Sequence, residues 1–139
     1  MTAVGNFSSI DISASGLFAQ RTKLDAIANN IANASTTRTD KGGPYKRQEV
    51  VFRARLGKLE GGEGGVEVAQ VLDSPEPPKM VYDPSHPDAG PDGTVAMPNV
   101  NIVEEMTDLI SATRAYEANV TAITAARQMA SKALEIGKG

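Results

Sequence analysis

The sequence predicts an α+β fold in which long N- and C-terminal helices pack as an antiparallel, coiled-coil-like pair, with a small antiparallel β unit and extended loops between them. Three observations support this prediction. Apolar residues recur with heptad spacing at both ends of the 139-residue chain, the 13 glycines and 8 prolines fall mostly in its middle, and short alternating stretches lie among them. We therefore divide the chain into an N-terminal helical segment (1–36), a β-rich segment (37–98) and a C-terminal helical segment (99–139).

The C-terminal segment predicts one uninterrupted helix from Asn101 to Ile136. Its stripe advances by alternating steps of four and three residues, the spacing that keeps side chains on one side of a helix. The stripe comprises Ile102, Met106, Leu109, Thr113, Tyr116, Val120, Ile123, Arg127, Ala130 and Leu134. Asn101 is the expected N-cap and Gly137 follows the last turn. Glu104 and Glu105 are interpreted as first-turn acidic residues that stabilise the helix dipole.

This helix is too long for its own domain to enclose. At about 1.5 Å per residue it spans roughly 50 Å, whereas a compact globule of this chain length is about 37 Å across. Burying each large aliphatic side chain contributes about 1.5–3 kcal/mol, so an apolar stripe left in water is unfavourable. The length therefore predicts self-association or co-assembly and favours a structural protein over an enzyme. The sequence leaves open which contacts of the stripe lie within one subunit and which lie between subunits.

The N-terminal segment predicts a second helix from about Ser8 to Ala34. Gly16 costs about 1 kcal/mol relative to alanine and weakens the first turns. The apolar positions Ile10, Leu17, Leu24 and Ile31 recur every seven residues. Near the end of this helix, Asn29, Asn30 and Asn33 mark either a fraying terminus or a packing role, and spacing alone does not choose between the two.

The middle of the chain predicts strands separated by turns. Residues 35–44 are polar and rich in turn formers. Strands are expected at Tyr45–Arg53, Gly65–Leu72 and Lys79–Tyr82, with a flexible glycine turn formed by Gly61, Gly62, Gly64 and Gly65. Six prolines between positions 75 and 91 keep the later connections extended.

Composition excludes several classes of function. A net charge of −3 without a Lys/Arg cluster argues against nucleic-acid binding, and the absence of cysteine excludes disulfides and thiolate metal sites. No apolar run approaches the roughly 18 residues of a membrane span, so no direct membrane insertion is expected. The N-terminus lacks the basic and apolar regions of a cleaved signal peptide. The chain is therefore expected to be cytoplasmic or exported without such a signal.

No group of residues forms a recognisable active site, and no cofactor is expected. The single histidine, His86, lies between Asp83 and Asp88 in a proline-rich loop. This trio is the one arrangement that suggests a divalent metal and a hydrolase or metal enzyme. A turn is the simpler interpretation, because a lone histidine in such a loop has no partner set for catalysis.

Residues 24–37, LDAIANNIANASTT, resemble the N-terminal pattern of the bacterial flagellar rod and hook family, L-D-x-I-x-N-N-I-A-N-x-x-T-T. Residues 43–52, 81–89, 95–101, 104–106 and 111–120 are similar to the members of that family that form the proximal rod, so the resemblance covers nearly the whole chain in register. Arg38 follows Thr37 where hook and distal-rod relatives usually carry Gly-Phe, which favours the proximal rod.

The resemblance implies a structural subunit of the flagellar basal-body proximal rod, not an enzyme. Such proteins leave the cytoplasm through the flagellar type III export apparatus and assemble helically into the drive shaft that transmits torque across the periplasm. Their terminal helices form the tube and their middle segment lies outside it. The implied partners are copies of itself, proximal and distal rod subunits and the rod-to-MS-ring adaptor. The helices alone also permit a cytoplasmic coiled-coil adaptor or export chaperone of the flagellar system.

The resemblance also implies which residues serve assembly, and the heptad pattern adds Leu17 to them. On the N-terminal side they are Leu17, Leu24, Ile27, Asn29, Asn30, Ile31, Asn33, Thr36 and Thr37. On the C-terminal side they are Asn99, Asn101, Met106, Leu109, Tyr116, Asn119, Val120 and Ile123. With the resemblance in view, the asparagines are expected to bond between helices or between subunits.

Overall fold

A computed structural model describes residues 2–55 and 64–138. Gly61 and Gly62 of the predicted glycine turn lie outside the described residues, whereas Gly64 and Gly65 are described and directly precede β2. In chain order the elements are α1 (Thr2–Ala32), β1 (Gln48–Ala54), β2 (Val66–Asp73), β3 (Lys79–Tyr82), β4 (Thr94–Met97) and α2 (Ile102–Gly137). Helix α1 begins six residues earlier than predicted and ends two residues earlier. The α+β class is confirmed.

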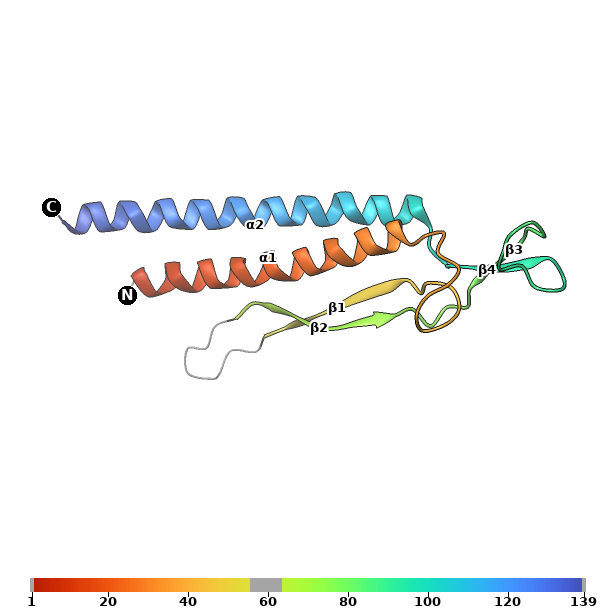
Figure 1. Ribbon diagram of the computed structural model, residues 1–139. Coiled ribbons are helices and arrows are strands. Elements are labelled where there is room, and N and C mark those ends of the chain that lie inside the picture. The colour runs from red at the N-terminus through yellow and green to blue at the C-terminus, as the bar shows by residue number, and fades with distance from the viewer. Residues whose placement is uncertain (1, 56–63, 139) are drawn as a thin grey trace.

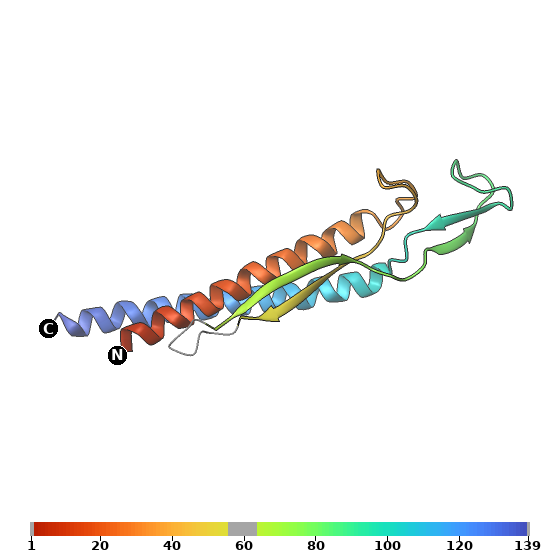
Figure 2. The same cartoon turned by 90° about the horizontal axis from the view of Figure 1, so that it is seen from below.

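The two helices run antiparallel along most of their length, with both chain termini at one end of an elongated molecule (Figure 1). The same pairing is visible from the perpendicular direction (Figure 2). Helix α2 begins where predicted, because the Asn101 side chain accepts hydrogen bonds from the backbone N–H groups of Val103 (3.1 Å) and Glu104 (3.5 Å). An asparagine N-cap of this kind satisfies donors that no helical carbonyl can reach.

The predicted stripe of α2 is divided between the seam of the helix pair and the open surface. Its members Leu109, Tyr116, Ile123 and Ala130 are partly buried. The alternate members Met106, Thr113, Val120 and Arg127 are exposed, and the positions one residue before them enter the seam instead: Glu105, Ala112, Asn119 and Ala126. Since α1 is the element that contacts α2, these buried positions face α1.

Small residues line this seam because they allow the helix backbones to approach closely. The buried apolar side chains of the pair are Ala19, Ala26, Ile27, Ala112 and Ala126. Gly16 lies against α2 as well, and a Cβ atom added there would stand 3.0 Å from Nδ2 of Asn119. Gly16 therefore serves close packing, in addition to the helix-weakening effect expected from its sequence position.

The β unit consists of two separate two-stranded antiparallel ribbons. Strands β1 and β2 pair with Val50 opposite Val71, and the register shifts between Val51 and Phe52. Strand β3 pairs with β4, which the sequence analysis did not predict, and buried Val95 lies opposite Val81. The first ribbon lies along α1, and the second projects beyond the end of the helices where α2 begins (Figures 1 and 2).

Ribbon β1–β2 is attached to α1 at several points along its length. The Ser15 hydroxyl accepts a hydrogen bond from the backbone N–H of Val66 (3.1 Å), and the Lys23 ammonium lies 5.9 Å from the centroid of the Phe52 ring. Gly65 adopts φ +128°, and an added Cβ atom would stand 2.5 Å from the Ser15 hydroxyl. Helix α1 is thus covered on two sides, whereas among the described helices and strands only α1 packs along α2. Within the described residues, no helix is long and apolar enough to cross a membrane.

The alanine seam yields a stability prediction. Ala112→Leu adds three heavy atoms to a buried position and is expected to lower the free energy of unfolding by about 1–3 kcal/mol through overpacking. Ala118→Leu, at an exposed position of the same helix, is the matched control and should change it by less than about 0.5 kcal/mol. Urea unfolding followed by circular dichroism measures both. Equal effects of the two substitutions would contradict the assignment of the seam.

Candidate assembly site and its buried polar cluster

Asn30 joins three segments of the chain at the end of the helix pair. The Asn30 side chain is buried, and its Nδ2 donates to the Gln48 carbonyl (3.0 Å) and to Oε2 of Glu105 (3.2 Å). Its Oδ1 accepts from the Tyr45 hydroxyl (2.8 Å) and from the Gln48 backbone N–H (2.8 Å). The amide thus uses both donors and both acceptor positions. Asn30, Tyr45, Arg47, Gln48 and Glu105 together form what we call the polar cluster.

Glu105 is the charged centre of the polar cluster. It lies in the first turn of α2, yet its side chain is fully buried. Arg47 forms an ion pair with it through Nε, and the same guanidinium contacts Glu49 (2.7 Å) and Asp108 (3.8 Å). Glu105 lies in the first turn of α2 as predicted, but helix-start electrostatics alone does not explain its position, because the carboxylate is enclosed by α1 and the segment before β1.

Electrostatic effects in the polar cluster follow from this packing. Partial burial alone lowers the pKa of Arg47, but the hydrogen bond to Glu105 and the charges of Glu105, Glu49 and Asp108 outweigh burial and raise the pKa above its ordinary value. Burial, together with the charges of Asp73 and Glu105, raises the pKa of Tyr45. Both residues therefore keep their protons at neutral pH and act as hydrogen-bond donors.

The polar residues that follow Asn30 in sequence organise the end of α1 and the loop after it. Asn33 donates from Nδ2 to the Asn29 carbonyl (2.9 Å), and the Thr36 hydroxyl donates to Oδ1 of Asn33 (3.2 Å). The Thr37 hydroxyl donates to Oδ2 of Asp88 (2.7 Å), and Arg38 forms an ion pair with the same carboxylate. These contacts connect the loop after α1 to the loop between β3 and β4. Asn29 itself is exposed.

The remaining residues implied in assembly lie in three settings. Leu17, Leu24, Ile31, Leu109, Tyr116, Asn119 and Ile123 are partly buried, and Ile27 is fully buried. Asn101 caps α2, and Asn99 donates to Oε2 of Glu76 (2.9 Å). Met106 and Val120 remain exposed. The structure therefore places most of this set within one subunit and leaves Met106 and Val120 on its surface.

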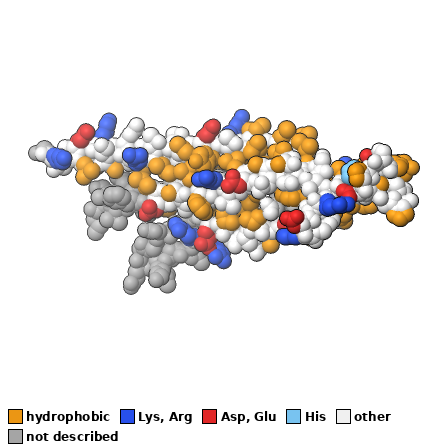
Figure 3. All heavy atoms as spheres, viewed as in Figure 1, with side chains coloured by type: hydrophobic (Ala, Val, Ile, Leu, Met, Phe, Trp, Pro, Cys, Tyr) orange, Lys and Arg blue, Asp and Glu red, His pale blue; other side chains and the backbone are white. Residues whose placement is uncertain are grey.

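Met106 and Val120 belong to a larger exposed face of α2. With Ile102, Ile110, Thr113 and Thr124 they recur at steps of three, four or seven residues and form what we call the outer stripe. Its apolar side chains are about half exposed, with 50% for Met106, 57% for Ile110 and 41% for Val120. Figure 3 shows hydrophobic side chains gathered over the N-terminal half of α2, whereas its C-terminal half carries fewer.

Two family models match the two ends of the chain. The model described as flagella basal body rod protein matches residues 10–38, which include most of α1 together with Asn29, Asn30 and Asn33. The model described as flagellar basal body rod FlgEFG protein C-terminal matches residues 92–136, which include all of α2 except Gly137.

Curated relatives match the chain over nearly its whole length. The flagellar basal-body rod protein FlgC of Borreliella burgdorferi is 47% identical over 98% of this chain and 100% of the relative. FlgC of Bacillus subtilis is 42% identical over 95% of this chain and 98% of the relative, and FlgC of Salmonella typhimurium is 40% identical over 92% and 95%.

The chain belongs to the FlgC family of flagellar basal-body rod proteins. The resemblance of its motifs is thereby confirmed, and the chain is a structural component of the basal-body rod. The adaptor or chaperone alternative receives no support. In this FlgC-family chain, the buried polar cluster lies where the terminal helices meet the middle segment.

The suggested metal trio of this FlgC-family chain has other contacts. Asp88 is held by Thr37 and Arg38, and Nδ1 of His86 accepts a hydrogen bond from the Asp88 backbone N–H (3.0 Å). Asp83 accepts from the Ser85 hydroxyl (2.6 Å). Among the residues that the structure describes, no group of three His, Cys, Asp or Glu side chains could hold a metal ion.

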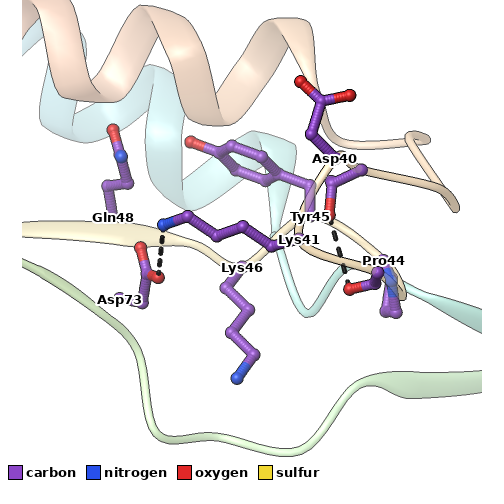
Figure 4. Close-up of a pocket in the computed structure, with 9 residues that line it drawn as sticks. Asp40, Lys41, Pro44, Tyr45, Lys46, Gln48 and Asp73 are labelled. Atoms are coloured by element: carbon purple, nitrogen blue, oxygen red, sulfur yellow. Dashed lines mark hydrogen bonds and ion pairs between the residues drawn. The ribbon is translucent and has the colours of Figure 1, made fainter.

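A cleft of about 340 Å³ lies between the loop after α1 and the start of ribbon β1–β2. Figure 4 shows Lys41 extending toward Asp73, where their charged groups are 3.8 Å apart, while Lys46 points away. The Tyr45 ring forms one wall and directs its hydroxyl to Asn30.

Asp88 provides a pH prediction. The hydrogen bond from Thr37, with a further contribution from Arg38, holds its pKa below the ordinary value of 3.8. Because the folded-state pKa is the lower one, the link stabilises the fold above pH 3.8 and is lost as the pH falls through the lowered pKa. Asp88→Asn should remove this pH-dependent contribution to the free energy of unfolding and loosen the two loops at pH 7. NMR titration measures the pKa of Asp88 in the wild-type protein, and amide exchange measures the mobility of the loops.

Asp40→Asn is the matched control, because Asp40 is an exposed carboxylate in the loop after α1, the loop that Asp88 contacts. An Asp88 resonance that titrates at or above the ordinary value in the wild-type protein would contradict the assigned contacts.

Proposed function

We propose that this chain assembles helically into the proximal rod through the outer stripe of α2, with residues 1–36 and 99–139 in the tube and residues 37–98 outside it. The observation that carries this proposal is the uncovered apolar face of α2. Three of its side chains, Met106, Ile110 and Val120, keep about half of their surface in water. Burying such side chains fully against a neighbour would contribute about 1 kcal/mol or more each.

The polar members of the outer stripe support the same proposal. The Thr113 hydroxyl donates to the Leu109 carbonyl (2.7 Å), and the Thr124 hydroxyl donates to the Val120 carbonyl (2.9 Å). A buried hydroxyl without a partner costs about 1–3 kcal/mol, and these two already have partners within the helix. Their methyl groups can therefore face a neighbouring subunit without that cost.

The proposed partners are other copies of this chain, proximal and distal rod subunits and the rod-to-MS-ring adaptor, with delivery by the flagellar type III export apparatus. In this role the chain transmits torque from the motor toward the hook. Many shallow contacts along a long helix suit that load, because each contributes little and all of them resist twisting together. The proposed role is structural and requires no catalytic residue or cofactor.

The proposed function is tested on purified, detergent-washed hook-basal bodies. Mass spectrometry should find several copies of this chain per particle, retained beside the other rod components, and a deletion strain should lack completed flagella. Absence of the chain from washed particles, or normal motility of the deletion strain, would overturn the proposal.

A single charge in the outer stripe provides a sharper prediction. Val120→Asp should abolish swimming and lower the incorporation of the chain into basal bodies at least tenfold, because an aspartate would be desolvated in the subunit contact. Ser111→Asp is the matched control, since Ser111 is exposed on α2 outside the outer stripe, and it should retain motility. Both variants should show the circular dichroism spectrum of the wild-type protein. Normal incorporation of Val120→Asp would show that another face carries assembly.

A further inference from the structure

The partner of the buried Glu105 carboxylate comes from neither helix. Arg47 lies in the segment that leads into β1, and among the described residues it is the one cation paired with Glu105. Asn30 of α1 completes the environment, because its amide contacts both Glu105 and the backbone of Gln48. A helix–helix contact is therefore satisfied by a residue of the β-rich segment.

This arrangement makes one contact depend on another. If α2 packed on α1 without the segment 45–48 in place, Glu105 would lie against Asn30 with no cation beside it. Removing one partner of a buried ion pair is strongly destabilising, because the remaining charge has lost both water and its counterion. If the segment docked without α2, Arg47 would keep only the more exposed Glu49.

We propose that Arg47 and Glu105 form a coupling device that makes the packing of α2 on α1 conditional on the docking of ribbon β1–β2. The three elements then fold and separate as one unit at this end of the molecule. This proposal does not rest on the proposed function, because it concerns one chain.

Further along the helix pair the seam is built differently. At the middle of the pair Gly16 closely approaches Asn119, and farther toward the C-terminus of α2 the buried residue of that helix is Ala126, so small side chains line the seam there. Little apolar surface is buried by such residues. Among the residues whose side chains the structure describes, the helix pair is therefore held most firmly at the polar cluster.

The first test is a double-mutant cycle on the full chain, read by amide hydrogen exchange with mass spectrometry. Arg47→Met should lower protection at the start of α2 by roughly 100-fold to 1,000-fold, the size expected for an unpaired buried charge. Glu105→Met should lower protection there less, because the partly exposed Arg47 keeps Glu49 and Asp108. The double variant should recover most of the loss, because two apolar side chains leave no charge behind. Glu49→Gln removes the exposed contact of the same Arg47 and should change protection less than threefold.

The location of the effect distinguishes coupling from simple destabilisation. Arg47→Met should lower protection in α2, although Arg47 precedes β1, and Glu105→Met should lower protection in β1. Ala126→Leu should lower protection only in the distal half of α2. Arg47→Lys keeps the positive charge and should give an intermediate loss of protection. This variant tests the proposal if Arg47→Met does not fold.

Three results would overturn the proposal. Additive effects of Arg47→Met and Glu105→Met would show that the two side chains are not coupled. Loss of protection confined to the element that carries each substitution would show that the elements fold independently. A wild-type chain without protection at the start of α2 would show that the polar cluster does not hold this end.

Discussion

The packing of the two helices depends on how one buried carboxylate, Glu105, is compensated. An ion pair in a protein interior offsets the cost of desolvation only where geometry and further hydrogen bonds are good, and here both Asn30 and Arg47 supply them. Asn30 in turn requires the backbone of Gln48 and the hydroxyl of Tyr45 at fixed positions. The position of α2 along α1 and the path of the chain into β1 therefore satisfy the same set of contacts.

Much of the fold could be predicted from the sequence, because periodicity and capping are local. The long helix and its Asn101 cap, three of the four strands and the antiparallel pairing of the helices follow from patterns within the chain. The seam was predicted only in part. A heptad stripe identifies the contact side of a helix only to within about one residue. The prediction followed the large apolar side chains and therefore passed over the alanines. The helices instead approach closely at Ala112 and Ala126, which leaves Met106 and Val120 outside.

The polar cluster could not be predicted, for a different physical reason. A glutamate in a first helical turn is usually explained by the helix dipole, and nothing local distinguishes Glu105 from exposed Glu104. Burial of Glu105 depends on Arg47, which is 58 positions away in sequence. The asparagine motif did contain a signal, since three asparagines near a helix end are poor helix formers and are expected to serve another purpose. Asn30 joins the segments, whereas Asn33 serves the local geometry of the helix end.

Helix α2 meets two different requirements on adjacent sides. Its seam toward α1 uses small side chains and one compensated charge, which gives a specific alignment with little apolar area. Its outer stripe has larger side chains, and the hydroxyls of its threonines already donate to carbonyls of the same helix. Both features suit burial against a neighbouring subunit. A rod subunit with large apolar residues on both sides would aggregate before it reached its place, and one with small residues on both sides would hold its neighbours weakly. Because the alignment is determined within the chain at Glu105, the outer stripe is presented in one orientation, and repeated lateral contacts can then follow a single helical lattice.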